Sequence, residues 1–290
     1  MGAFLPAPTI LERVIRRYCR KLAVLYLPGP KGDVRRAYGP ERSQFGDLYL
    51  PPGAGLHPVL IAIHGGFWRA KYGLEHLGHL CKALTGLGLA TWNVEYRRLG
   101  QPGGGWPGTF QDIGMAAQRV EALAGEFPLD LGRLAVLGHS AGGHLALWLA
   151  AASAGRAISG VPELGDLRLP PLRSAISMAG VSDLAAAWEM GLGAGVVSGL
   201  MNGSPKQYPE RYAAASPVEM LPIGIPQILL HGRLDATVPF ALSERYAAVA
   251  ESYGDPVRLV PLEGLGHFEL IDPRSAAWPV VTAAVLIALQ

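Results

Sequence analysis

The segment Leu134–Leu145 constrains the fold most strongly, because an apolar run passes through Gly-His-Ser-Ala-Gly into an Ala/Leu-rich stretch without a break. This is the G-x-S-x-G pattern in the order strand, sharp turn and helix. Gly138 and Gly142 carry no Cβ, so a strand and a helix can approach closely around a strained turn. Such a turn places the Ser140 hydroxyl at its tip and the Ala141 N–H at the start of the helix, where it can face negative charge.

The same pattern has an ordinary structural explanation, because a Gly/Ser-rich turn after a strand is often only a turn. A serine hydroxyl is also a weak nucleophile and needs a base within hydrogen-bond reach. Histidine suits that role because its pKa is near the working pH, and a carboxylate fixes its tautomer. A catalytic role for Ser140 therefore requires a histidine and an acid elsewhere in the chain.

Strand and helix patterns alternate from Val59 onward. The predicted strands cover residues 34–38, 44–50, 59–63, 90–94, 134–137, 175–179, 227–230 and 257–262, and the predicted helices cover 74–87, 109–123, 141–152, 239–253 and 273 to the end. This alternation predicts an α/β fold with a mostly parallel central sheet and helices on both faces. In such sheets, functional groups collect at the carboxyl ends of the strands.

Two segments stand outside the alternation. Residues 1–30 contain a helical pattern from Thr9 to Leu25 with apolar and arginine faces, which predicts an N-terminal helical extension over a core edge. A basic amphipathic helix on a membrane surface is the alternative. Residues 181–220 are rich in Gly, Ala and Pro and are expected to form a small cap insertion over the site. We expect residues 1–290 to form a single domain with both segments attached.

Composition excludes several classes of protein. A net charge of +2 gives no electrostatic case for nucleic acid as a partner. No apolar run reaches the roughly 18 residues that span a bilayer, and the N-terminus lacks a signal-peptide pattern, so we expect a cytoplasmic protein without a membrane span. Cys19 and Cys81 lack metal-type spacing and are expected to be free buried thiols. We therefore expect no metal and no organic cofactor.

The acid and the base that Ser140 requires follow predicted strands in the expected order. Asp235 comes after the strand at 227–230 and His267 after the strand at 257–262, which gives the order Ser…Asp…His. Taken alone, Asp235 fits a turn and His267 fits a packed loop histidine. Asp183 is an alternative acid. The three required residue types in order predict a catalytic triad of Ser140, Asp235 and His267.

From about Gln44 to its C-terminus the chain resembles the α/β-hydrolase superfamily. The matching segments are His64-Gly65-Gly66-Phe67-Trp68, Gly138-His139-Ser140-Ala141-Gly142-Gly143, His231-Gly232-x-x-Asp235-x-x-Val238-Pro239 and Gly266-His267. Within the superfamily, the His-Gly-Gly-aromatic-Trp form is similar to kynurenine-formamidase-like and feruloyl/acetylxylan-esterase-like enzymes. Relatives in the hormone-sensitive-lipase group usually carry His-Gly-Gly-Gly instead.

The resemblance implies that the loop after the strand at 59–63 builds an oxyanion hole. The expected oxyanion-hole residues are Gly65, Gly66, Phe67 and Ala141. Glycine lets backbone N–H groups turn toward a developing oxyanion, and such donors contribute roughly 10²–10³ in rate. His64 is expected to order this loop rather than to act on the substrate.

Other side chains receive mostly structural interpretations. Glu95 and Asp112, with the two arginines at 97 and 98, are expected to form a structural polar network. Four aromatic residues are candidates for an acyl or aryl pocket, although large aromatic side chains usually belong to the core: Trp68, Trp106, Trp188 and Phe268. We expect only Trp68 to contact substrate, because it is tied to the oxyanion loop.

The leading interpretation is a serine hydrolase that cleaves short-chain carboxylic esters through an acyl-enzyme, with a small-molecule ester or amide as its substrate. Arylformamidase activity is the alternative that the His-Gly-Gly-Phe-Trp segment suggests. A peptidase shares the His-Gly-x-x-Asp-x-x-Val-Pro segment, but the chain has no room for the propeller domain of such enzymes. A non-catalytic binding protein on the same scaffold typically lacks a triad member, and this chain has all three.

Overall fold

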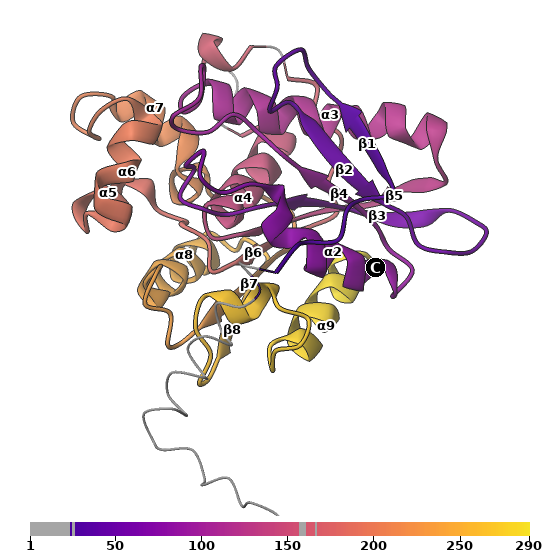
Figure 1. The fold of residues 1–290 in the computed structure, drawn as a ribbon. Coiled ribbons are helices and arrows are strands. Elements are labelled where there is room, and N and C mark those ends of the chain that lie inside the picture. The colour runs from indigo at the N-terminus through magenta and orange to yellow at the C-terminus, as the bar shows by residue number, and fades with distance from the viewer. Residues whose placement is uncertain (1–23, 25–26, 157–160, 166) are drawn as a thin grey trace, which may run out of the picture.

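The computed structural model describes residue 24 and residues 27–156, 161–165 and 167–290 (Figure 1). The predicted helix from Thr9 to Leu25 lies almost entirely outside the described residues. An eight-stranded sheet runs through the protein in the order β1-β2-β4-β3-β5-β6-β7-β8. Its strands are β1 (Val34–Ala37), β2 (Phe45–Tyr49), β3 (His57–Ile63), β4 (Ala90–Val94), β5 (Leu129–His139), β6 (Ala175–Met178), β7 (Gln227–Gly232) and β8 (Val257–Leu262).

Helices cover both faces of this sheet. The α-helices are α2 (Gly78–Thr85), α3 (Gly108–Glu126), α4 (Ala141–Ser153), α5 (Leu184–Glu189), α6 (Leu192–Met201), α7 (Pro209–Ala215), α8 (Phe240–Ser252) and α9 (Trp278–Ala288). Short 3-10 helices are η1 (Leu74–Leu77), η2 (Pro162–Leu164), η3 (Pro217–Met220) and η4 (Phe268–Ile271).

Strand β3 shows why its residues form a central strand. Val59, Ile61 and Ile63 pack into one core cluster with residues of α3 and α4. Leu60 and Ala62 point the other way, into a second cluster with residues of α2 and α9. A strand buried on both faces needs an unbroken apolar run, which is what the sequence supplies.

The strands from β3 to β8 are parallel, and β1 and β2 are antiparallel additions at one edge. The predicted mostly parallel sheet with helices on both faces is therefore confirmed. The loops that follow β3, β5, β7 and β8 all emerge at the carboxyl ends of these parallel strands. This end of the sheet carries the candidate site.

The largest differences from the predicted boundaries are at three elements. The helix expected over 74–87 is divided into η1 and α2. Strand β5 begins at Leu129, because its first residues pair with the start of β3 before a register shift. The last helix begins at Trp278 rather than near Pro273, since Asp272 and Ser275 accept backbone N–H bonds in a turn that precedes it.

Residues 181–220 form a group of short helices, α5, α6, α7 and η3, that lies to one side of the sheet (Figure 1). The Ser216 hydroxyl accepts a hydrogen bond from Leu184 N at 2.9 Å, which ties the two ends of the group together. Cys81 is a free, buried thiol, and Cys19 lies outside the described residues. Across the described ranges, no helix combines the length and apolar character needed to cross a membrane.

Candidate active site

Ser140 occupies a strained turn between β5 and α4. Its backbone has φ 57° and ψ −120°, in a region that residues with a side chain rarely adopt. A Cβ on Gly138 would overlap the carbonyl oxygen of Gly142, and a Cβ on Gly142 would overlap that of Ile63. The predicted strand–turn–helix geometry is confirmed, and both glycines are required by close backbone approach.

Asp235 and His267 form a close pair beside this turn. The His267 Nδ1 lies 2.6 Å from Asp235 Oδ2, in the loops that follow β8 and β7. The other carboxylate oxygen accepts the backbone N–H of Thr237 at 2.7 Å and of Val238 at 2.9 Å. His231 Nε2 lies 3.3 Å from Asp235 Oδ2 and gives the carboxylate a further donor.

These contacts determine the charge of Asp235 and the tautomer of His267. Burial raises the pKa of Asp235, but hydrogen bonds from His231 and His267 outweigh it and hold the pKa well below its usual range. An ionised carboxylate only accepts, so Nδ1 of His267 carries the proton that it donates to Asp235. Its Nε2 is then free to act as a base.

Two neighbouring rings hold the His267 imidazole in place. His139 lies with its ring centroid 4.5 Å away, and its Nε2 donates to the His267 carbonyl at 3.0 Å. Burial, followed by the nearby His267, holds the pKa of His139 well below its usual range, so this ring stays neutral. The Phe268 ring stands perpendicular to His267 at 5.0 Å.

Ser140 and His267 line one cavity of about 110 Å³. Its other walls are Gly65, Gly66, Phe67, Tyr72, His76, His139, Thr237, Phe268 and Ile271. The loop predicted to form an oxyanion hole thus shares a cavity with the serine and the histidine. Most of the wall is apolar or aromatic, which suits a small acyl or aryl group.

The loop after β3 has an unusual backbone. Gly66 has φ 109°, and Phe67 and Trp68 have φ 52° and 53°. Gly66 O accepts the N–H of Arg69 at 3.0 Å, which closes a tight turn. Among the residues that the structure describes, none accepts a hydrogen bond from the N–H of Gly66 or Phe67. The first N–H groups of α4, beginning at Ala141, likewise have no partner within their helix.

Trp68 is not where the sequence analysis expected it. The side chain is fully buried, and its ring packs edge-on against His144 at 5.2 Å. The positive φ angles at Phe67 and Trp68 turn the chain so that Phe67 lines the cavity and Trp68 enters the core. The prediction that Trp68 contacts substrate is therefore corrected, and Phe268, one of the other pocket candidates, lines the cavity instead.

The alternative acid is occupied elsewhere. Asp183 caps α5 by accepting the N–H of Ala186 at 2.9 Å, and its other oxygen lies 3.5 Å from Arg245 Nη1. His144 is also structural, since its Nε2 donates to Ala215 O at 2.9 Å. Within the described part of the chain, no group of three or more His, Cys, Asp or Glu residues is arranged to hold a metal ion.

Several residues that line or support the site have no functional role predicted from the sequence. Tyr72 lies between the predicted strand at 59–63 and the predicted helix at 74–87, His76 lies inside that predicted helix, and neither belongs to a motif. His231 was quoted only as part of a motif, and the structure places its Nε2 3.3 Å from Asp235 Oδ2. Ile271 lies one helical turn after His267, in η4.

Comparison with known proteins extends these observations. The BD-FAE family model matches residues 46–249. The chain is 28% identical over 270 residues to Esterase LipC from Mycobacterium tuberculosis, covering 89% of this chain and 62% of LipC. It is 27% identical over 256 residues to the Oryza sativa subsp. japonica protein named Probable isoprenylcysteine alpha-carbonyl methylesterase ICME, covering 81% of this chain and 58% of that protein. The chain thus spans less than two thirds of either relative.

Among solved structures, a truncated form of carbohydrate esterase from gut microbiota has a TM-score of 0.78 at 19% sequence identity. The match covers 90% of this chain and 99% of that chain, so the two share a fold. The resemblance to the α/β-hydrolase superfamily that the motifs predicted is confirmed. On the family match over residues 46–249 and the eight-stranded sheet, the protein belongs to the BD-FAE family and has the α/β-hydrolase fold.

Proposed function

We propose that the protein is a serine hydrolase of small carboxylic esters, with Ser140, His267 and Asp235 as its catalytic triad. The observation that carries the proposal is the shared cavity. It brings a serine on a strained turn together with a histidine whose Nδ1 is held by a buried carboxylate. The esterase names of the relatives support the same reaction class.

In this mechanism His267 Nε2 removes the proton of Ser140 as its oxygen attacks the ester carbonyl. The N–H groups of the 65–67 loop and of Ala141 stabilise the tetrahedral oxyanion. The carbon–oxygen ester bond then breaks, and His267 returns the proton to the departing alcohol. Water repeats the sequence on the acyl-enzyme and releases the acid.

The size of the cavity favours small acyl groups. Its volume is about 110 Å³, below that of the engineered ~150 Å³ cavity that binds benzene. The cavity therefore suits acetyl to butyryl groups better than long chains. Phe67, Tyr72 and Phe268 in its wall also support an aryl substrate, which keeps arylformamidase activity as a second candidate.

We also propose that residues 181–220 cap the site. A Cβ on Gly193 would lie 2.9 Å from the Phe67 ring, and Arg69 Nη2 donates to Gly193 O at 2.6 Å. These contacts support a cap that rests on the oxyanion loop. The cytoplasmic location, the single-domain organisation and the absence of a nucleic-acid partner stay predictions.

The test is a panel of p-nitrophenyl acetate, butyrate and octanoate beside N-formylkynurenine, each with wild type and Ser140→Ala. We expect turnover of acetate and butyrate that the substitution removes. Preference for N-formylkynurenine would move the assignment to a formamidase. Turnover that survives in Ser140→Ala would refute the triad, and serine-dependent turnover of none of the four would favour a binding protein.

A further inference from the structure

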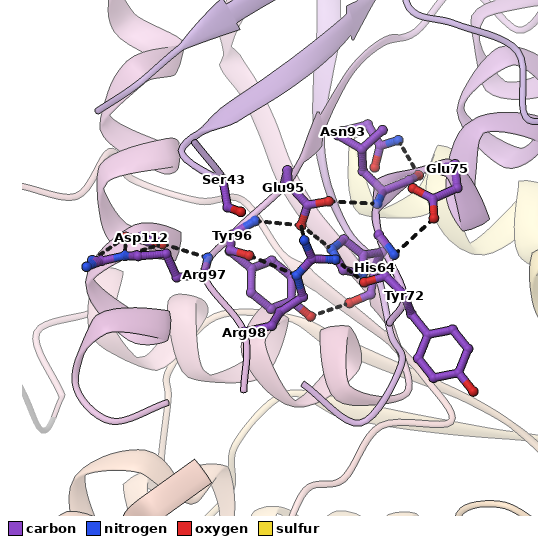
Figure 2. A network of polar contacts seen from close by, with 12 residues as sticks. Ser43, His64, Tyr72, Glu75, Asn93, Glu95, Tyr96, Arg97, Arg98 and Asp112 are labelled. Carbon is purple, nitrogen blue, oxygen red and sulfur yellow. Dashed lines mark hydrogen bonds and ion pairs between the residues drawn. The ribbon is translucent and has the colours of Figure 1, made fainter. Parts of the chain in front are cut away.

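A single carboxylate lies at the centre of the buried polar cluster behind the oxyanion loop (Figure 2). Glu95, which follows β4, is 5% exposed. Its Oε1 accepts from His64 Nε2 at 2.9 Å, from Tyr96 N at 2.9 Å and from Arg98 Nη2 at 3.1 Å. Its Oε2 accepts the N–H of Leu74 at 3.3 Å. One side chain therefore joins the ends of β3 and β4 to η1.

The partners of His64 require both of its ring nitrogens to carry protons. Nδ1 lies 2.8 Å from the carbonyl oxygen of Gly65, and Nε2 lies 2.9 Å from Glu95. Tyr96 N and Arg98 Nη2 donate to Glu95 Oε1 and Leu74 N donates to Oε2, so both carboxylate oxygens face donors and neither carries a proton. A carbonyl and an ionised carboxylate only accept hydrogen bonds, so both nitrogens donate and the ring is an imidazolium.

Tyr96 completes the enclosure of this cation. Its ring stacks on the His64 ring with centroids 4.5 Å apart and planes 18° apart, which suits a cation–π contact. Its hydroxyl donates to the His64 carbonyl oxygen at 2.9 Å. The Tyr96 hydroxyl thus holds the His64 carbonyl, and the His64 ring holds the Gly65 carbonyl.

One of these hydrogen bonds acts on the Gly65–Gly66 peptide unit at the cavity wall, and the other holds the peptide unit before it. The Gly65 carbonyl and the Gly66 N–H belong to one planar peptide unit, so fixing the oxygen fixes the direction of the N–H. A cationic donor on the oxygen also polarises the unit and makes its N–H a stronger donor. Gly66 lines the cavity with Ser140, and none of the described residues accepts its N–H.

We propose that Glu95, His64 and Tyr96, here named the loop clamp, are positioning residues that orient and polarise the Gly66 N–H for the oxyanion. The inference rests on the proposed hydrolase function. The sequence predicted that His64 orders the loop and placed Glu95 only in a structural network, and the inference gives both residues, with Tyr96, one shared role. None of the three lines the cavity, so the loop clamp acts through the loop and does not touch the substrate.

A neighbouring carboxylate supplies a matched control. Asp112 is fully buried and accepts from Arg97, as Glu95 accepts from Arg98, and it also accepts from Gln44 Nε2 at 2.7 Å (Figure 2). Among the described residues, the hydrogen-bond partners of Asp112 do not include the 64–68 loop. Asparagine at 112 can still accept the backbone N–H of Arg97, which follows Tyr96, so Asp112→Asn tests the loss of a buried carboxylate charge while the hydrogen bonds of the loop clamp are kept.

The experiment compares Glu95→Gln with Asp112→Asn on p-nitrophenyl acetate. A glutamine at 95 keeps its amide oxygen at the Oε1 position, where it still accepts from His64 Nε2, Tyr96 N and Arg98 Nη2, and turns its NH₂ toward Leu74 N. The change therefore removes the negative charge beside the His64 ring while the hydrogen bond from Nε2 persists. We expect kcat to fall on the order of 10-fold to 10²-fold, less than the 10²–10³ that follows removal of an oxyanion donor. KM should stay within about 2-fold, because only transition-state stabilisation is lost. Asp112→Asn should keep kcat within about 2-fold of wild type.

A second readout separates the oxyanion from general stability. The thionoester analogue places sulfur, a poorer hydrogen-bond acceptor, where the oxyanion oxygen forms, so its hydrolysis depends less on the loop N–H groups. Wild type should prefer the oxygen ester, and Glu95→Gln should reduce that preference while Asp112→Asn leaves it unchanged. Should Glu95→Gln not fold, Tyr96→Phe removes only the hydroxyl donor and should reduce the same preference.

The outcomes distinguish this inference from the proposed function. Folded Glu95→Gln with wild-type kcat and preference would overturn it, as would equal losses in Glu95→Gln and Asp112→Asn. If Glu95→Gln does not fold, an unchanged preference in Tyr96→Phe would overturn it. Turnover that persists in Ser140→Ala would instead refute the hydrolase mechanism itself.

Discussion

Replacing Asp235 by asparagine tests the acid of the triad, because the surrounding hydrogen bonds fix the orientation of the new amide group. The asparagine amide must place its oxygen at one carboxylate position and its NH₂ at the other. Backbone N–H groups of Thr237 and Val238 occupy the Oδ1 side at 2.7 and 2.9 Å and need an acceptor. The NH₂ group is therefore forced to the Oδ2 side, facing His267 Nδ1.

The consequence for His267 follows from its two nitrogens. Facing an NH₂ donor, Nδ1 must accept, so the proton of the neutral ring moves to Nε2. A protonated Nε2 cannot remove the proton of Ser140. In a serine protease this wrong tautomer lowers kcat by about 10⁴, equivalent to about 5 kcal/mol of transition-state free energy. We expect a loss of the same order here.

The assay is kcat for p-nitrophenyl acetate at neutral pH, with Asp183→Asn as the matched control. Asparagine at 183 can still cap α5, so this variant should keep kcat within about 2-fold of wild type. Folding of both variants is checked by urea unfolding. Asp235→Asn with more than about 1% of wild-type kcat would refute the reasoning, since the tautomer argument allows only about 0.01%. A large loss in Asp183→Asn would transfer the role to that residue.

Three further predictions concern close approach, cavity size and pH. Gly142→Ala places a Cβ against the Ile63 carbonyl and should lower the free energy of unfolding by about 1–3 kcal/mol or more. Gly125→Ala, in open space on α3, should not lower it. Equal urea midpoints for the two variants would contradict this prediction. Phe268→Ala enlarges the cavity and should raise the ratio of octanoate to acetate kcat/KM, and an unchanged ratio would count against Phe268 as its wall. Burial lowers the pKa of His144 to about 4, so its contribution to stability is complete above about pH 6.5 and falls by roughly 3 kcal/mol as the pH drops to 4. Urea unfolding at pH 7 and pH 5 should show a smaller acid-induced loss in His144→Gln than in wild type.

The sheet was predictable because its signal is local. Val59–Ile63 is apolar at every position, and the strand is buried on both faces by packing on two helical layers. The elbow was predictable for a related reason, since close approach at Gly138 and Gly142 excludes every larger residue. In both places the residue types determine the backbone conformation almost alone.

The walls of the cavity were less predictable because residue type does not determine the direction of a side chain in a strained loop. Phe67 and Trp68 are adjacent large aromatics, and only their positive φ angles decide which one faces the cavity. Tyr72 reaches the cavity from a turn, and His76 from a 3-10 segment that the sequence predicted as the start of a longer helix. Residues 181–220 combine short helices with left-handed turns at glycines, which gives no clear period either.

Two histidine–carboxylate pairs have different roles in this protein, and the partner of the second ring nitrogen determines the role of each histidine. His267 and His64 each have a nitrogen against a buried carboxylate, Asp235 or Glu95. The other nitrogen of His64 donates to the Gly65 carbonyl, so the ring holds both protons and stays a cation. No described residue is hydrogen-bonded to Nε2 of His267, which leaves it able to accept a proton beside Ser140. A carboxylate–histidine motif in sequence therefore predicts a base only when the partner of the second nitrogen is also known.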